Sequence, residues 1–399
     1  MAINKSLEEA VFICCENIQP LDSEYLWIDD AFMRVAADDI SSGIDVPNFD
    51  RSAVDGYVIS RADLEKLKTG NPLSLLVTDT IQAGSIESKP LKSGETYRIM
   101  TGALLPEGCA AVIKQEDVQI DGNYIIAGRG WKPGENIRRA GHELRAGDRV
   151  AAKGQVLTAE ILERVAACGI AKILVHKIPR VYIIETGSEL ILPGSPIKTG
   201  QIYGSNRSLI SGKIAGTGAM PLLAKSIIED DLEAIASEIE KAAHVADMVI
   251  ISGGTGNGVY DLVYKAFAYL NAEPLFRGID IIPGKGSSAT LYNGKLLYNL
   301  SGNPYAAGLI FDALIKPALL RLKGDLFSAR EWFDIQLGGQ IKNIKPVRSL
   351  CRGEMIIKEG CVYAQPISKD SNYVGNIPII LDLQAGQGLM GDMVRAKLC

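Results

Sequence analysis

The sequence predicts a multidomain protein of the α/β plus β class. Strand-like runs of β-branched residues alternate with helix-like segments between Pro179 and Gly324, which predicts a mostly parallel sheet covered on both faces. Short strand-like runs without helical periodicity occupy about Ser74–Asp148 and the stretch after Gly324, which predicts two small mostly-β domains. At 399 residues the chain exceeds one ordinary hydrophobic core, so two to four domains are expected.

Composition narrows the functional class. Apolar residues make up 47% and charged residues 22% of the chain, which is typical of globular proteins. The formal net charge of −5 argues against a duplex nucleic-acid binder, which needs a basic surface. Seven scattered cysteines with no CxxC pair indicate reduced thiols in a reducing compartment.

The first residues predict an amphipathic helix. Ser6 and Glu9 have the spacing of a capping box, and a helix capped near Asn4 or Ser6 is expected. The apolar patch that follows is too short for a signal peptide or a membrane-spanning helix. We therefore expect a cytoplasmic protein that does not bind membranes.

Each further helix or strand is predicted from the length of its apolar run, from its periodicity and from the turn residues that bound it. Strands have the length and β-branching of buried runs, while helices have caps or an apolar stripe. In the first β region we expect strands at Leu73–Val77, Ala111–Gln115 and Asn123–Ile126, followed by a helix at Thr158–Cys168 that stops at Gly169. In the α/β region we expect strand Val181–Ile184, helix Ser205–Gly216, strand Leu222–Ile228, a helix opened by Asp230 with Glu233 in the capping-box position, strand Met248–Ile251, helix Tyr260–Leu270, strands Phe276–Ile281 and Leu296–Leu300, and helix Pro304–Leu322. In the last region we expect strands at Phe333–Leu337, Glu354–Ile357, Val362–Gln365 and Pro378–Leu383.

A glycine-rich turn, Ser252–Gly256, directly follows a buried strand of the α/β region. Ligands of open α/β sheets bind at the carboxyl ends of the strands, where glycines let backbone N–H groups approach a phosphate. The alternative is a tight strand–helix turn that needs positive φ angles. We favour anion binding over that alternative.

Three further loops meet the same edge of the predicted sheet. Glu189 follows the first strand and suits a Mg²⁺ ion held by few carboxylates plus substrate phosphates, although a first-turn helix acid is the alternative; Asp261 allows the same two readings. Lys285 lies in the Pro283–Gly286 loop and could contact a phosphate or simply face solvent, and Ser301–Pro304 follows the next strand. The convergence of these loops indicates a site more strongly than any one of them.

The first β region also carries charged and hydroxyl residues beside glycine turns, in Asp50–Tyr57 and Arg98–Ala103. They could contact an oxyanion or belong to a solvated loop with a hairpin turn. Arg138 and Arg139 could hold an anion bidentately or pair with surface acids. Three dispersed histidines and the lack of a G-x-S-x-G motif favour binding and metal-assisted transfer over a zinc site or a covalent nucleophile.

Taken together, the motifs resemble those of the MoeA/gephyrin-E family. Phe49–Tyr57 is similar to its FDxSAxDGY signature, and four more segments match in order: Arg98–Ala103 (RIMTGA), Asn136–Gly141 (NIRRxG), Thr186–Leu190 (TGxEL) and Ser205–Arg207 (SNR). These matches span Pro47 to Pro304, with a weaker match beyond.

The resemblance implies an activity and a domain plan. The activity is insertion of molybdate into adenylylated molybdopterin with Mg²⁺, releasing AMP and molybdenum cofactor. The assembly is an elongated homodimer, whose sites lie between the α/β domain of one subunit and the β domain of the other; other cofactor-biosynthesis proteins are potential partners. In this sequence the plan would give an N-terminal helix (1–21), a linker region (22–46 and 141–177), an inserted mostly-β domain (47–140), a MogA-like three-layer α/β domain (178–324) and a C-terminal β domain (325–399).

The resemblance also implies which individual residues form the site. The acidic and hydroxyl site residues would be Asp55, Thr101, Glu143, Glu189 and Asp261, with Glu189 and Asp261 as metal ligands; Glu143 replaces a more usual Asp. The substrate-binding residues would be Arg138, Arg139, Ser252, Gly253, Gly254, Thr255, Gly256, Lys285, Gly302, Asn303 and Pro304.

The chain also departs from the family pattern. Ile282 replaces the first lysine of KPGKP, and Gly286 replaces its final proline. A serine hydroxyl is missing at Gly256, an acid at Val259 and another hydroxyl at Ala306. Because a molybdate pocket would use such groups, the alternatives are a molybdopterin carrier or sensor without metal insertion, a tungstate-preferring homologue or, with less support, a scaffold.

Overall fold

The computed structural model describes residues 4–86, 89–128, 130–254, 262–328, 332–341, 344–368 and 377–399. The chain forms two compact units. The core unit contains Met1–Asp38, Lys153–Thr158 and Lys172–Cys399, and the inserted unit contains Asp39–Ala152 and Ala159–Ala171.

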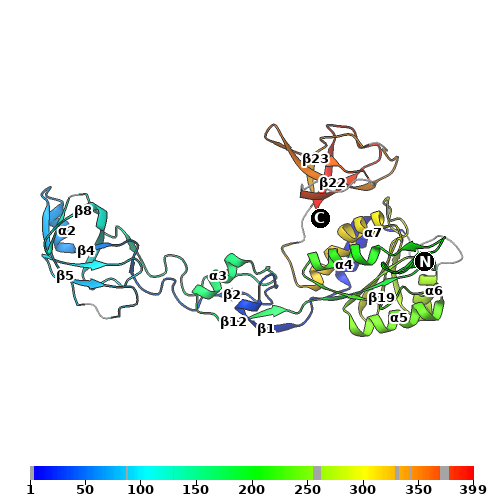
Figure 1. Ribbon diagram of the computed structural model, residues 1–399, viewed down its shortest axis with the longest axis horizontal. Coiled ribbons are helices and arrows are strands. Elements are labelled where there is room, and N and C mark those ends of the chain that lie inside the picture. The colour runs from blue at the N-terminus through cyan, green and yellow to red at the C-terminus, as the bar shows by residue number, and fades with distance from the viewer. Residues whose placement is uncertain are drawn as a thin grey trace. The chain divides into compact units, whose positions relative to one another are not determined.

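The inserted unit is built on a mostly antiparallel sheet with strand order β7-β4-β6-β5-β9-β8 (Figure 1). Its elements are β2 (Ile40–Ser41), β3 (Arg51–Ser52), β4 (Gly56–Ser60), α2 (Arg61–Leu67), β5 (Leu73–Ile81), β6 (Glu95–Ile99), β7 (Cys109–Lys114), η2 (Gln115–Asp117), β8 (Val118–Asp121), β9 (Tyr124–Ala127), β10 (Ile137–Arg138), β11 (Arg149–Ala151) and α3 (Ala159–Ala167). All residues of β4 are buried, because Tyr57 and Ile59 pack into one apolar cluster and Val58 into another. Gly56 allows β4 to approach β7, since a Cβ there would stand 2.0 Å from the Ile113 carbonyl oxygen.

The core unit contains the α/β sheet, with strand order β16-β13-β17-β20-β19-β18. Strands β13 (Arg180–Glu185), β16 (Met220–Leu223), β17 (Met248–Ser252) and β20 (Lys295–Leu300) are parallel neighbours, whereas β19 (Ser288–Tyr292) is antiparallel to both β20 and β18 (Glu273–Arg277). The carboxyl ends of β13, β17 and β20 therefore meet at one edge. The mostly parallel sheet predicted from the sequence is present.

Helices cover both faces of this sheet (Figure 1). On one face α5 (Leu232–Val245) and α6 (Leu262–Tyr269) bury side chains such as Ile251 and Leu297. The other face packs against α1 (Leu7–Glu16), α4 (Asn206–Gly216), α7 (Pro304–Ile310), the π-helical turn η3 (Phe311–Ile315) and α8 (Lys316–Leu322). No helix among the described residues is long and apolar enough to cross a membrane.

Three local predictions for this region need correction. Asp231, not Asp230, caps α5, and its side chain accepts a hydrogen bond from Ala234 N, so the expected box with Glu233 does not form. The predicted strands Leu222–Ile228 and Phe276–Ile281 begin earlier, as β16 and β18. The closing helix is interrupted by η3, because Pro317 lacks the N–H that a regular α-helical turn would use.

A separate sheet with strand order β21-β25-β24-β22-β23 lies at the end of the chain. Its strands are β21 (Phe333–Gln336), β22 (Ser349–Lys358), β23 (Cys361–Pro366), β24 (Ile377–Leu383) and β25 (Met393–Leu398). The remaining elements of the core unit are β1 (Ser23–Trp27), η1 (Ile28–Asp30), β12 (Lys172–His176), β14 (Leu190–Ile191) and β15 (Ile202–Tyr203). None of the seven cysteines forms a disulfide in the described part of the chain.

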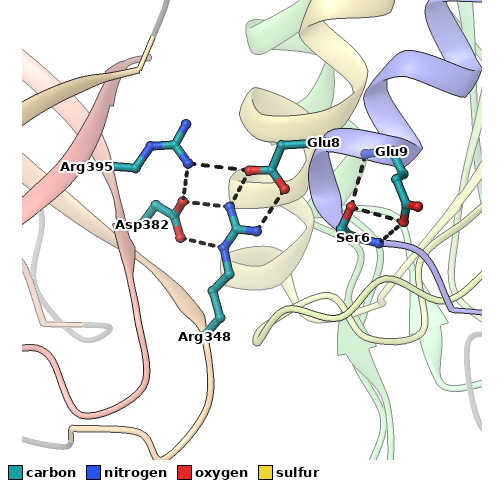
Figure 2. Close-up of polar contacts among 6 residues, drawn as sticks. All are labelled: Ser6, Glu8, Glu9, Arg348, Asp382 and Arg395. Atoms are coloured by element: carbon teal, nitrogen blue, oxygen red, sulfur yellow. Dashed lines mark hydrogen bonds and ion pairs between the residues drawn. The ribbon is translucent and has the colours of Figure 1, made fainter.

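Figure 2 shows the polar contacts between α1 and this last sheet, which we call the ion cluster: Glu8, Arg348, Asp382 and Arg395. Arg348 donates to both oxygens of Glu8 at 2.6 and 2.8 Å and to both oxygens of the buried Asp382 at 2.7 and 2.9 Å. Arg395 lies 3.5 Å from Glu8 and 3.6 Å from Asp382. The hydrogen bonds from Arg348 lower the pKa of Glu8 to about 2. The cluster thus ties the first helix to the C-terminal sheet.

Candidate active site

The main cavity, of about 560 Å³, opens at the carboxyl ends of β13, β17 and β20. Six of the predicted site residues line it: Glu189, Ser252, Gly253, Gly254, Gly302 and Pro304. Its wall is completed by residues of the loops after β13, of α4 to α6 and of the loop before α5, including Glu185, Thr186, Tyr203, Asn206, Asp230 and Val263. The predicted convergence of loops at this sheet edge therefore produces a cavity of ligand size.

The Ser252–Gly254 turn needs its glycines for packing. Gly253 and Gly254 have φ angles of 122° and 63°, a region that favours glycine. A Cβ on Gly253 would stand 2.3 Å from the Thr186 carbonyl oxygen and 2.7 Å from its Oγ1. Gly253 N donates to Leu300 O at 3.1 Å, while Thr186 N donates to Ser252 O at 3.0 Å. The tight-turn explanation is thus satisfied, and anion binding by the same turn stays a prediction.

Three buried side-chain oxygens in this wall have no hydrogen-bond partner among the described residues: Glu185 Oε2, Thr186 Oγ1 and Asn206 Oδ1. The Asn206 amide is held by donation to Ser252 Oγ at 2.6 Å and to Gly302 O at 2.9 Å, and Glu185 Oε1 accepts from Arg207 N at 3.1 Å. Sequence reasoning placed none of these three among the site residues. A charged residue that ends a buried strand, as Glu185 does, was the available signal.

Two further carboxylates line the main cavity. Asp230 Oδ2 accepts hydrogen bonds from Ser188 N and Oγ, both at 3.1 Å. Glu189 is exposed, and no described residue donates a hydrogen bond to its carboxylate. The described residues contain no cluster of three metal-ligating side chains. Mg²⁺ needs only one or two carboxylates when substrate phosphates supply the other ligands, so Glu189 fits such an ion.

Lys285 and Asn303 line a second cavity of about 310 Å³, beside Pro283, Ser301 and Ala306. They do not line the main cavity, so the structure distributes the predicted residues of this sheet edge over two hollows. Asn303 Oδ1 also caps α7 by accepting from Tyr305 N at 2.9 Å and from Ala306 N at 3.3 Å. We call this second hollow the Lys285 cavity.

In the inserted unit the structure brings Asp55 and Thr101 together. Gly56 of β4 pairs with Ile99 of β6, so the residues just outside this pair lie side by side. Asp55 Oδ1 accepts from Thr101 N at 2.7 Å and from Thr101 Oγ1 at 2.9 Å. These bonds from Thr101 lower the pKa of Asp55 below the ordinary value of an aspartate.

The two predicted arginines lie nearby in sequence but pair with different acids. Arg139 donates to Asp50, while Arg138 lies 4.0 Å from Glu143, which also accepts from Arg51 at 3.2 Å. Pairing with surface acids, the alternative reading of the sequence, is what the structure contains. All of these side chains remain substantially exposed and can exchange partners.

The predicted residues Thr255, Gly256 and Asp261, and the departure at Val259, lie outside the described residues.

Comparison with known proteins matches most of the chain to two family models. The family model of the MoeA N-terminal region (domain I and II) matches residues 5–169, and that of a probable molybdopterin binding domain matches residues 182–321. The molybdopterin molybdenumtransferase of Bacillus subtilis (strain 168) is 32% identical over 78% of this chain and 74% of its own length. Molybdopterin molybdenumtransferase 2 of Mycobacterium tuberculosis (strain H37Rv) is 30% identical over 88% of each chain.

Solved structures agree with this assignment. Two crystal structures of the molybdopterin biosynthesis MoeA protein from Pyrococcus horikoshii have TM-scores of 0.82 and 0.81, at 29% and 27% identity. The first match covers 99% of both chains and the second covers 100% of both. By sequence along most of its length and by fold along all of it, the chain belongs to the MoeA family of molybdopterin molybdenumtransferases.

Proposed function

We propose that the protein inserts molybdenum from molybdate into adenylylated molybdopterin, with release of AMP, in the biosynthesis of molybdenum cofactor. The observation that carries this proposal is the main cavity, which lies within the segment that matches the molybdopterin binding domain. Its size suits a pterin nucleotide or a large part of one. Membership of the molybdenumtransferase family supports the reaction.

Two groups of residues would contact different parts of the substrates. Backbone N–H groups of the Ser252–Gly254 turn would face the phosphates, and Lys285 with the Lys285 cavity would receive the oxyanion. Glu189, with Asp261, would hold Mg²⁺. When bound, that ion would neutralise negative charge on the phosphates as AMP leaves.

The inserted unit would complete the site from a second copy of the chain. Asp55 and Thr101 form a ready hydrogen-bonded pair, and Glu143, Arg138 and Arg139 form an exposed charged group. Neither group lines the main cavity or the Lys285 cavity. We therefore propose a homodimer, in the cytoplasm, with the five-region domain plan expected from the sequence and with other cofactor-biosynthesis proteins as partners.

A carrier or sensor of molybdopterin is the second candidate. The observation in its favour is the composition of the Lys285 cavity, where Ala306 contributes no hydroxyl, and of the neighbouring Ile282, which contributes no charge. The polar side chains that remain there are those of Lys285, Ser301, Asn303 and Tyr305. Fewer polar groups weaken the capture of molybdate but leave the main cavity unchanged.

The deciding experiment is a turnover assay with purified protein and adenylylated molybdopterin. We expect AMP release only when molybdate or tungstate is added with Mg²⁺. Comparison of the two oxyanions at equal concentration identifies the preferred metal. Tight binding of the nucleotide without AMP release under any of these conditions would establish the carrier or sensor instead.

A further inference from the structure

The main cavity is lined on one side by acceptors and negative charge. Its described lining residues include the acids Glu185, Glu189 and Asp230, but no lysine, arginine or histidine. Glu185 Oε2 and Asn206 Oδ1 are buried acceptors with no partner among the described residues. Such a wall repels phosphates, except where Mg²⁺ or the Ser252–Gly254 turn offsets the charge, and it favours a part of a ligand that carries N–H donors.

A second wall of the main cavity is formed by the short strands β14 and β15. Leu190 of β14 pairs with Ile202 of β15, and both line the cavity together with Tyr203. Ile202 is 57% exposed and Tyr203 is 44% exposed. Because apolar side chains that stay exposed inside a cavity are stabilised when a ligand covers them, this wall suits a flat apolar surface.

Tyr203 is held in place from two directions. Its hydroxyl donates to Ser195 O at 2.9 Å, so the hydroxyl is already bonded within the protein. The hydrogen bonds of Ile202 N and Gly204 N to the neighbouring strand segment, both at 2.9 Å, fix the backbone on either side. The part of Tyr203 that remains for a ligand is therefore the aromatic ring. A ring that is already oriented loses little conformational entropy when it binds.

The ring of Tyr203 and the carboxylate of Glu185 belong to neighbouring parts of the cavity wall. Gly204 directly follows Tyr203, and a Cβ on Gly204 would stand 2.8 Å from Glu185 Oε2. The backbone next to Tyr203 therefore packs against the acceptor that has no partner. A flat ring with N–H groups on its edge can contact both residues, because its face and its edge point in perpendicular directions.

We propose that Tyr203 is the stacking residue of the main cavity, and that it packs against the face of a flat nitrogen heterocycle whose N–H edge bonds to Glu185. The inference rests on the proposed function and deepens it, since adenylylated molybdopterin carries two such heterocycles, the pterin and the adenine. Stacking on an aromatic side chain is favourable for either ring. Tyr203 is thus a substrate-binding residue that leaves the phosphates to the mouth of the cavity.

Calorimetric titration of the full-length protein tests this assignment, with neopterin and adenosine as separate probes. We expect at least one probe to bind, and Tyr203→Ala to weaken its binding about tenfold or more. Tyr203→Phe keeps the ring and should bind nearly as tightly as the unaltered protein. Glu185→Gln should weaken the same probe, because one acceptor oxygen becomes a donor group. Binding of neopterin assigns the cavity to the pterin, and binding of adenosine alone assigns it to the adenine.

Tyr269→Ala is the matched control, because Tyr269 is exposed on α6 and does not line the main cavity. It should leave the affinity for both probes unchanged. In the turnover assay Tyr203→Ala should raise KM for adenylylated molybdopterin and change kcat little, since stacking holds the substrate and the transition state alike.

Three results would overturn the stacking assignment. They are equally tight binding by a folded Tyr203→Ala protein, binding by Tyr203→Phe that is as weak as that of the alanine variant, and no binding of either probe at millimolar concentration. AMP release by the unaltered protein judges the proposed function separately. Release of AMP without binding of either probe contradicts only the stacking, whereas binding that depends on Tyr203 without AMP release supports the stacking and contradicts only metal insertion.

Discussion

Two carboxylates at the main cavity differ in what holds them. Asp230 accepts two hydrogen bonds from Ser188, whereas no described residue donates to Glu189. An acid that is already bonded within the protein is less available to a cation than one that is not. Of the two exposed carboxylates of this cavity, Glu189 is therefore the one on which Mg²⁺-dependent activity should depend.

We expect Glu189→Gln to lower AMP release at least tenfold, because the amide keeps the size of the side chain but removes its charge. A tenfold loss corresponds to about 1.4 kcal/mol of transition-state stabilisation. The rate should be measured with adenylylated molybdopterin over a range of Mg²⁺ concentrations. Glu240→Gln, an exposed change on α5, serves as the control and should have no effect. Unchanged activity of the Glu189 variant at saturating Mg²⁺ would remove this residue from the site.

At the scale of elements, the local capping box of α1 stabilises a helix that packs against residues far away in the sequence. Ser6 Oγ accepts from Glu9 N at 3.2 Å, and a Glu9 carboxylate oxygen accepts from Ser6 N at 2.9 Å, the capping box expected from the sequence. The cap fixes the start of a helix whose buried face, with Leu7 and Cys14, packs into the α/β core. Weakening the cap should therefore loosen α1 before it affects the sheet.

Ser6→Ala should destabilise α1 by about 1 kcal/mol, because Glu9 N loses its acceptor and the Glu9 carboxylate loses the bond from the Ser6 hydroxyl. Amide hydrogen exchange within α1 should then be about fivefold faster, with little change in β17. Ser6→Asp keeps a capping oxygen and should exchange like the unaltered protein. Equal protection of α1 in the Ser6→Ala protein would mean that tertiary packing alone holds the helix.

Helices and strands were predictable from the sequence where their local residue pattern agreed with the environment that they occupy in the fold. The buried runs of β13, β17 and β20 and the cap of α1 fall within a residue or two of their predicted places. Strand β19 was missed, although Asn293-Gly294 gave a hairpin signal: β19 and β20 pair through Tyr292 and Lys295 around this two-residue turn, with positive φ at both turn residues. The run before it, rich in serine, lacked the apolar alternation that would have marked a strand.

The site was predictable in part for the same reason. Loops at the ends of parallel strands must meet at one sheet edge, so residues such as Ser252 and Gly302 could be grouped from chain order alone. The division between the main cavity and the Lys285 cavity depends on how the loops pack, which no local pattern encodes. The register of β3 against β10, which places Arg138 opposite Arg51 so that both lie near Glu143, is likewise not encoded locally.

At the scale of the whole molecule, the ion cluster makes the attachment of α1 to the C-terminal sheet sensitive to acid. The pKa of Glu8 is lowered from 4.5 to about 2, first by its hydrogen bonds to Arg348. Because the folded value lies below the unfolded one, its stabilising contribution is complete above about pH 4.5 and is lost as the pH falls towards 2.

We expect acid to weaken this attachment within that window, and Glu8→Gln to remove most of the pH dependence. Trp332 reports on the region, since Arg395 lies 5.3 Å from its ring centre and the ring packs against the core. Its fluorescence can be followed from pH 6 to 2 after Trp27 and Trp131 are replaced by phenylalanine. Glu16→Gln, an exposed change at the other end of α1, is the control. A transition that is the same in the Glu8→Gln protein would exclude Glu8 as its source.

The proposed homodimer makes a separate prediction about activity. If Asp55 of one subunit and Glu189 of the other serve one site, a mixture of inactive Asp55→Ala and Glu189→Gln proteins should regain activity. Each mixed dimer then has one intact site, so random exchange restores about a quarter of the unaltered activity. Confirmed subunit exchange without recovered activity would mean that both residues act within one chain.

The ion cluster also fixes an order of events during synthesis. Glu8 and Arg395 are 387 residues apart, so a ribosome that adds about 5–20 residues per second makes the second roughly 20–80 s after the first. Over that interval the first helix has no Arg348 or Arg395 to bind, and its apolar face must wait for α8 as well. The inserted unit, whose residues end at Ala171, can fold while more than half of the chain is still to be made. The first helix to leave the ribosome is therefore among the last to reach its final contacts, and a nascent-chain chaperone would meet it exposed.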